Sequence, residues 1–297
     1  MALSFTTLDV FTDTPFKGNP LAIVQVPRNV YLSQDQKQRI AQEFNLTETV
    51  FLHEQTSADI AAREARIDIF TPIAEVPFAG HPTIGTSSFI VDHLQLTSVD
   101  TLIAKAGRLP FTRHDKGVQL AVAHDVHVHS SPFAETDFGH FPVVSIVKGM
   151  TFILAKQPDL VSLGKPKANF VGVDGTYEVQ DRLDEGWQTG LVASYPYVDQ
   201  GIDDKGTRQL RSRCLGSRED PATGSAASAL CSYITLQEGN EGPLTRRYQV
   251  TQGVELGRRS EIFVQVTLEE SRDRVKEVLL GGSAVQTVEG KINIPSE

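Results

Sequence analysis

Short runs of Val, Ile, Leu and Phe recur along most of the chain, and turn-forming residues separate them. Runs of this kind predict β-strands. We expect strands over residues 5–11, 22–26, 49–52, 66–70, 118–122, 143–147, 152–155, 170–173, 191–195, 261–266 and 277–280. Residues 199–213 are instead polar and rich in charge, which is typical of a solvated loop.

Helical patterns are fewer than strand patterns. Ser33 followed by Gln36 matches a capping box and predicts a helix that runs to about Phe44. Two further helices are expected to begin near Pro82 and Pro221, and both consist mainly of small residues without charge until their far ends. A helix that lacks a charged face has no obvious solvent side, so we expect protein to surround both.

The sequences at these two small-residue helices are related. Residues 75–83 and 219–225 each combine an acidic residue, a proline and a glycine, and the two helix-opening prolines are 139 residues apart in a chain of 297. The pattern predicts an α+β fold of two similar halves, each a curved sheet around one central helix. We place these halves at residues 1–125 and 126–297, with a last strand that could return to the first half.

The composition narrows the classes of partner. The formal net charge is −9, so the phosphates of nucleic acids and anionic membranes would repel the chain, and we expect neither as a partner. No apolar run approaches the ~18 residues of a membrane span, and the N-terminus lacks a signal-peptide pattern. Cys214 and Cys231 form no CxxC pair, which favours a reducing, cytoplasmic location.

Glu48 is the first candidate for chemistry. If residues around it form a strand, Glu48 shares a face with Leu46, Val50 and Leu52, because successive side chains alternate. A carboxylate with such neighbours is paired, lies at a strand end in solvent, or serves in proton transfer, since burial raises the pKa of a carboxyl group towards neutrality.

Polar residues near the helix starts are further candidates. His81 directly precedes the proline of the first small-residue helix, where unsatisfied backbone N–H groups attract anions. Asp220 and Ser225 flank the start of the second, although Asp220 could equally serve as its N-cap. Asn19 follows a glycine, so it either forms a tight turn or places its amide on a ligand.

The remaining motifs are less informative. Residues 252–260 fit a turn between strands and an anion site equally well. The chain has no nucleophile elbow, P-loop, zinc-protease or dinucleotide-binding motif. His124, His127 and His129 look like a metal cluster, but only Asp125 offers a carboxylate at nearby spacing, so we expect no metal.

In this order and spacing, the motifs resemble the PhzF-like (phenazine-biosynthesis-type) family. The resemblance covers nearly the whole chain, and its most specific blocks are Phe-Ala-Gly-His-Pro at 78–82 and Glu-Asp-Pro-Ala-Thr-Gly-Ser at 219–225. It implies a diaminopimelate epimerase-like fold, with two pseudo-symmetric halves, each a barrel-like sheet around a central helix, and the site between them. It also implies an isomerase that needs no cofactor, acts on a small anionic metabolite and forms a homodimer.

The resemblance further implies roles for individual residues. The catalytic set is Glu48, His81 and Asp220, with Glu48 carrying the proton. The substrate-binding set is Asn19, Gly80, Gly224 and Ser225. Residues 212–217 depart from the aromatic, proline-containing run that the family usually has there, so one wall of the substrate pocket is expected to differ.

Two other functions remain open. One is a catalytically silent relative that binds a metabolite or a protein. The other is an amino-acid racemase or epimerase. The related epimerases carry a cysteine at each helix start, whereas Cys214 and Cys231 lie outside the motifs, so such a reaction would depend on Glu48 or Asp220.

Overall fold

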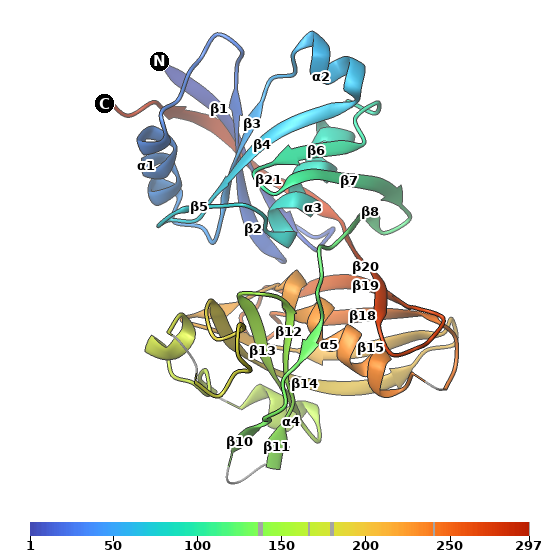
Figure 1. Cartoon of the computed structure of the whole chain (residues 1–297). Coiled ribbons are helices and arrows are strands. Elements are labelled where there is room, and N and C mark those ends of the chain that lie inside the picture. Colours follow the sequence, from blue (N-terminus) through green and yellow to red (C-terminus); the bar gives the residue numbers. More distant parts are fainter. Residues whose placement is uncertain (136–138, 166, 179–180, 240, 297) are drawn as a thin grey trace. The chain divides into compact units, whose positions relative to one another are not determined.

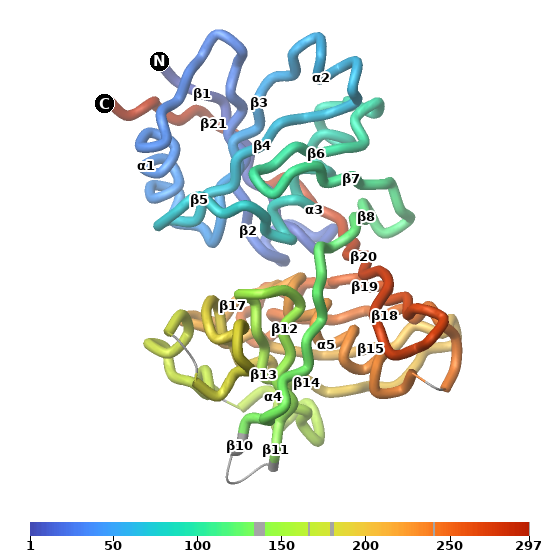
Figure 2. The backbone as a smooth tube through the Cα atoms, viewed as in Figure 1, coloured from blue at the N-terminus to red at the C-terminus, as the bar shows by residue number. Residues whose placement is uncertain are grey.

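The computed structural model describes residues 1–135, 139–165, 167–178, 181–239 and 241–296. The chain divides into two compact units, which Figures 1 and 2 show in the colours of the sequence. The first unit consists of residues 1–121 together with 281–297, and the second of residues 122–280. The C-terminal segment therefore belongs to the same unit as the N-terminus.

The first unit is a curved sheet with three α-helices. Its strands are β1 (Ala2–Val10), β2 (Asn19–Val26), β3 (Thr49–His53), β4 (Glu64–Phe70), β5 (Glu75–Val76), β6 (Thr101–Ala104), β7 (Gly107–His114), β8 (Gly117–Ala121) and β21 (Ala284–Asn293). The pairing order is β21–β1–β2–β3–β4, and it continues from β4 through β6 and β7 to β8. The β2–β3 and β4–β6 pairs are parallel, and the other pairs are antiparallel.

Helix α3 (Gly80–Ser88) is the central helix of this unit. It packs against β1, β2, β3, β8 and β21, and every residue from His81 to Ser88 is buried. Its small residues allow this close approach: a Cβ atom added at Gly85 would lie 2.6 Å from the side chain of Leu21 and 2.7 Å from that of Val10. The prediction of a small-residue helix surrounded by protein is confirmed here.

Two capping boxes begin the other helices of the first unit. In α1 (Gln34–Phe44), Ser33 accepts a hydrogen bond from the backbone of Gln36, whose side chain accepts one from the backbone of Ser33, as predicted. Helix α2 (Ser57–Ala62) begins with the same arrangement between Thr56 and Asp59. Hydrogen bonds, chiefly from Thr56, lower the pKa of Asp59 to about 2.

The second unit repeats the plan of a sheet around one helix. Its strands are β9 (His127–Val128), β10 (Phe133–Glu135), β11 (Gly139–Phe141), β12 (Val143–Val147), β13 (Met150–Lys156), β14 (Leu191–Ile202), β15 (Thr207–Ser212), β16 (Cys214–Leu215), β17 (Glu219–Asp220), β18 (Thr245–Gln252), β19 (Ser260–Leu268) and β20 (Val275–Gly282). The main order is β9–β12–β13–β14–β15–β18–β19–β20, with parallel β13–β14 and β15–β18 pairs. A short helix, α4 (Leu160–Gly164), and a 3₁₀ turn (Asp174–Thr176) lie between β13 and β14.

Helix α5 (Gly224–Gln237) is the central helix of the second unit. It packs against β12, β13, β18 and β19, and its residues from Ala226 to Ser232 are all buried. The second small-residue helix is therefore also surrounded by protein, as predicted. The sequence predicted that this helix begins near Pro221, and in the structure it begins three residues later, at Gly224.

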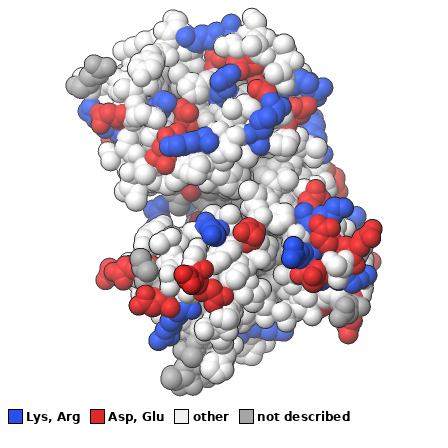
Figure 3. Space-filling model, viewed as in Figure 1, with Lys and Arg blue, Asp and Glu red and all other residues white. Residues whose placement is uncertain are grey.

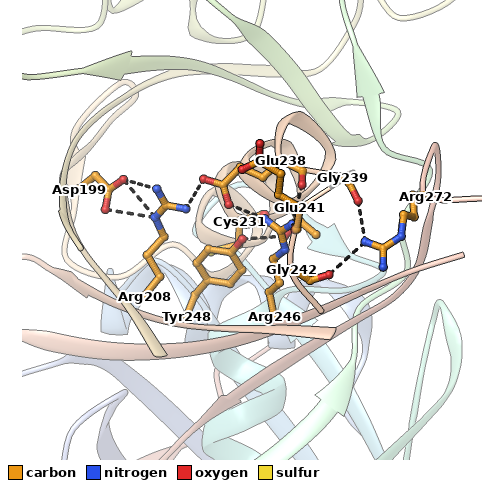
Figure 4. Close-up of polar contacts among 11 residues, drawn as sticks. Asp199, Arg208, Cys231, Glu238, Gly239, Glu241, Gly242, Arg246, Tyr248 and Arg272 are labelled. Atoms are coloured by element: carbon orange, nitrogen blue, oxygen red, sulfur yellow. Dashed lines mark hydrogen bonds and ion pairs between the residues drawn. The ribbon is translucent and has the colours of Figure 1, made fainter. Parts of the chain in front are cut away.

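Arginine side chains donate hydrogen bonds to backbone carbonyls at and just after the C-terminal end of α5 (Figure 4). The guanidinium of Arg246 donates to the carbonyl of Glu238 at 2.7 Å and also to the carbonyl of Glu241. Arg272 donates to the carbonyl of Gly239 at 2.7 Å. Glu238 is the C-cap residue of α5, and the C-terminal end of a helix carries partial negative charge, so cationic donors stabilise this end.

Two sequence predictions about the second unit are wrong. Residues 170–173 form turns rather than a strand, because the backbone N–H of Phe170 donates to the hydroxyl of Ser194 and its ring packs into a core cluster. Residues 199–213 are not a solvated loop. They form most of the β14–β15 hairpin, and Arg211 and Arg213 are buried there.

Candidate active site

The first turn of α3 places His81 next to Glu48. Ala79 is the N-cap residue, and Gly80 and His81 are the first two residues of the helix. Glu48 lies directly before β3 (Thr49–His53), which matches the strand predicted over residues 49–52. Nδ1 of His81 is 3.6 Å from Oε2 of Glu48, and the two side chains are only 6% and 19% exposed. A shielded carboxylate beside an imidazole is suited to proton transfer.

Asn19 lies in β2, which pairs with β3, the strand that begins directly after Glu48. It is the first residue of β2, is 1% exposed, and its Oδ1 atom accepts a 3.4 Å hydrogen bond from the hydroxyl of Thr47. The turn before it requires glycine: Gly18 has φ +68, and an added Cβ would lie 2.3 Å from the carbonyl oxygen of Val10. The predicted turn is present, and it delivers Asn19 into the interior near the chain segment that carries Glu48.

The start of α5 is built in the same way as that of α3. Thr223 is the N-cap residue, and Gly224 and Ser225 occupy the positions that Gly80 and His81 occupy in α3. Neither N-cap side chain bonds to its own helix. The first-turn N–H groups of a helix, with the positive end of the helix dipole, favour an anionic group.

Asp220 is not the N-cap of α5. It lies in β17, opposite Cys214, and its Oδ2 atom accepts a 2.6 Å hydrogen bond from the hydroxyl of Thr223. The capping alternative for this residue is therefore wrong. Its carboxylate is fixed by a residue of its own motif instead.

Gln252 supports the segment that carries Asp220. Its Nε2 donates to the carbonyl of Asp220 at 2.8 Å and to the hydroxyl of Thr223 at 3.1 Å. Its Oε1 accepts from the buried hydroxyl of Tyr195 at 2.9 Å and from the backbone of Thr223 at 3.3 Å. The side-chain amide thus uses both of its donors and two acceptor sites, a role that the sequence analysis missed in residues 252–260.

Arg213 also fixes the segment that carries Asp220, through the neighbouring Glu219. Its guanidinium makes two hydrogen bonds to the carboxylate of Glu219, at 2.8 and 2.9 Å, and it is 6% exposed. It also donates to the carbonyls of Leu163, at 3.0 Å, and Lys165, at 2.7 Å. Residues 212–217, which depart from the family pattern, therefore contain the anchor of the Glu-Asp-Pro block.

Replacing this anchor is expected to lower stability strongly. Arg213→Met should reduce the free energy of unfolding by about 3 kcal/mol, because it leaves a mostly buried carboxylate and two carbonyls without their donor. The control is Arg259→Met, since Arg259 pairs with Glu261 but is 60% exposed. That change should cost less than about 1 kcal/mol. Urea unfolding of both variants measures the difference, and equal losses would contradict the anchoring role.

Neither cysteine lies at a helix start, and both are buried. Cys214 is in β16, and Cys231 lies in the middle of α5. Burial raises the pKa of both thiols, so they stay protonated at neutral pH. Neither is placed or ionised as an epimerase cysteine would be.

Comparison with known proteins identifies the family. The model of the phenazine biosynthesis-like protein family matches residues 8–290. The chain belongs to this family. The trans-2,3-dihydro-3-hydroxyanthranilate isomerase of Pseudomonas aeruginosa is 31% identical to it over 299 residues, which cover 97% of this chain and 98% of that protein. Isomerase function, as predicted, is thereby confirmed at the level of enzyme class.

Solved structures establish the fold. A phenazine biosynthesis protein of the PhzF family from Bacillus anthracis superposes with a TM-score of 0.73 at 21% identity, covering 99% of this chain and all of that one. A probable proline racemase from Agrobacterium radiobacter gives a TM-score of 0.58 at 14% identity, covering 99% of this chain and 93% of that one. The predicted epimerase-like α+β fold, with a central helix in each half, is confirmed.

Proposed function

We propose that this phenazine biosynthesis-like protein is a cofactor-independent isomerase that moves a proton on a small carboxylate-bearing substrate through Glu48. The observation that carries the proposal is the shielded Glu48 carboxylate 3.6 Å from His81, at the start of a buried helix. One carboxylate can remove a proton from one substrate atom and return it to another. Such a reaction is neutral in charge and in redox state, so it requires only acid–base groups and an oriented substrate.

The other predicted residues fit supporting roles. His81 assists proton movement from its place beside Glu48, and Asp220 contributes from β17, where Thr223 and Gln252 fix its segment. Asn19, Gly80, Gly224 and Ser225 bind the substrate. The N–H groups at the first turns of α3 and α5 suit a carboxylate, because the positive ends of helices favour anions.

The substrate carboxylate has to be bound by hydrogen-bond donors close to it, because the chain as a whole is acidic. The net charge is −9, and Figure 3 shows acidic and basic side chains interspersed on the face that it presents. None of the described helices has the length and apolar character that a membrane span requires. A cytoplasmic location and a homodimer remain predictions.

Proton exchange with solvent identifies the substrate class. Wild-type protein in deuterated buffer is incubated with a panel of cyclic and amino-acid carboxylates, beginning with trans-2,3-dihydro-3-hydroxyanthranilate, and NMR follows each carbon-bound proton. Deuterium at a ring carbon together with a shifted double bond supports the proposed isomerisation. Exchange of an amino-acid α-proton with loss of optical purity would support a racemase instead. Binding without exchange on any compound would favour the catalytically silent alternative.

A further inference from the structure

Two histidines and a carboxylate converge on one face of the second unit's sheet. His127 lies in β9 and His129 follows it by two residues, so both side chains point to the same face. Asp184 reaches them from 57 residues after His127. Its Oδ2 lies 2.8 Å from Nε2 of His127 and 3.9 Å from Nδ1 of His129, and the three ligand atoms lie within 4.8 Å of one another.

The hydrogen bonds of His129 fix which of its nitrogens carries the proton. The backbone N–H of Asp184 donates to Nδ1 at 3.1 Å, so Nδ1 has no hydrogen. Nε2 therefore carries it and donates to the hydroxyl of Ser145 at 2.9 Å.

Three electron-pair donors consequently face one small space. The carboxylate of Asp184 accepts hydrogen bonds from the backbone N–H and the hydroxyl of Ser130, and it lies 2.8 Å from Nε2 of His127. The lone pair of Nδ1 of His129 faces the same region and has no hydrogen of its own. Without an ion, hydrogens from the backbone N–H of Asp184, from Ser130 and from His127 satisfy these atoms. A divalent cation can replace those hydrogens and accept all three electron pairs at once.

Groups behind the cluster hold it in position. The indole of Trp187 stacks on the ring of His127, with centroids 4.5 Å apart and planes 10° apart. The hydroxyl of Ser130 donates to Asp184 at 2.6 Å. Ser145, on the far nitrogen of His129, accepts the hydrogen bond that a metal-binding histidine typically makes with its second nitrogen.

We propose that His127, His129 and Asp184 bind a divalent ion of the zinc class, with a fourth position open to water. Nitrogen and carboxylate ligands suit this class, and metal–ligand bonds of about 2.0–2.1 Å place tetrahedral ligand atoms about 3.3 Å apart. The separations here, from 2.8 Å to within 4.8 Å, bracket that value. Binding replaces the proton of His127 and the N–H contact at His129 with bonds to the ion. No metal was expected from the sequence, because Asp184 is 55 residues or more from both histidines along the chain.

Cobalt titration of the full-length protein tests this site, because tetrahedral Co²⁺ has intense visible absorption. Wild-type protein should develop this absorption up to one equivalent, and added Zn²⁺ should remove it. His127→Gln and Asp184→Asn should abolish it. Ser145→Ala should weaken the affinity by about 10–100-fold, as loss of an outer-shell hydrogen bond does.

The matched control is His124→Gln, since Nδ1 of His124 lies 3.0 Å from the carbonyl of Val122 and His124 is not in the cluster. It should bind Co²⁺ like the wild type. Circular dichroism in EDTA establishes that each variant is folded, and His127, at 31% side-chain exposure, is the substitution best tolerated. Failure of the wild type to saturate, or equal absorption in folded His127→Gln, would overturn the proposal.

Discussion

Glu48→Gln is expected to lower turnover by a factor of about 10²–10⁴, the usual contribution of a positioned acid–base group. Glutamine keeps the size and shape of the side chain but cannot accept and return a proton. The substrate should still bind, because the proposed binding groups are unchanged. Steady-state kinetics should therefore show a large fall in kcat with a much smaller change in KM.

The control for this change is Glu43→Gln. Glu43 is an exposed residue of α1, only five positions from Glu48, and it is not among the proposed site residues. It should keep wild-type kcat and KM. Thermal melting should show that Glu48→Gln remains folded. Wild-type kcat in a folded Glu48→Gln protein would remove Glu48 from the mechanism.

Gly253→Ala is expected to cause the largest loss of stability among the substitutions considered, about 3 kcal/mol or more. Gly253 has φ +74, which costs an alanine roughly 1–2 kcal/mol. An added Cβ would also lie 2.5 Å from the carbonyl oxygens of both Arg258 and Pro221. Backbone atoms cannot rotate away as a side chain can, so overpacking adds a further cost of about 1–3 kcal/mol.

Gly257→Ala separates these two costs within the same turn. Gly257 has φ +71, but an added Cβ would meet no atom within 4 Å. It should lose only the conformational part, roughly 1–2 kcal/mol. Urea unfolding gives both values, and equal losses would contradict the close packing at Gly253. Because Pro221 follows Asp220 directly, Gly253→Ala should also reduce activity, whereas Gly257→Ala should not.

Local patterns in the sequence predicted the central elements of the fold. The capping box at Ser33 and Gln36 depends on residues three apart, and the structure contains it. The small, uncharged composition of the residues in α3 and α5 indicated burial on all sides, which is also observed. These features are encoded over a single turn or helix, so one sequence is sufficient to read them.

Strands with polar sequences were not predictable in the same way. β15 (Thr207–Ser212) and β18 (Thr245–Gln252) contain several Arg, Gln and Thr residues, and they pair in parallel with each other. Charged side chains there find partners elsewhere in the chain, as Arg211 does with Glu255, in the turn after β18, at 2.9 Å. Composition cannot reveal such partners, so the polar segment 199–213 was misread as a loop.

The contacts within the candidate site were also not predictable, because they join residues that are distant in the sequence. Glu48 and His81 were identified from their motifs, but only the fold establishes that they are 3.6 Å apart. The support that Gln252 gives to Asp220, Thr223 and Tyr195 depends on residues 29 to 57 positions away. Asp184 lies 57 and 55 positions after the two histidines that it contacts, and it was missed for the same reason.

The central claim is that Glu48 transfers a proton between substrate atoms, and deuterium incorporation tests it most directly. Wild-type, Glu48→Gln and Glu43→Gln proteins are incubated in deuterated buffer with a substrate of the panel, and NMR measures the deuterium gained at carbon. Incorporation by the wild type and Glu43→Gln, with none above background for Glu48→Gln, is the result that we predict. Equal incorporation by folded Glu48→Gln would contradict the mechanism and assign the proton to another group.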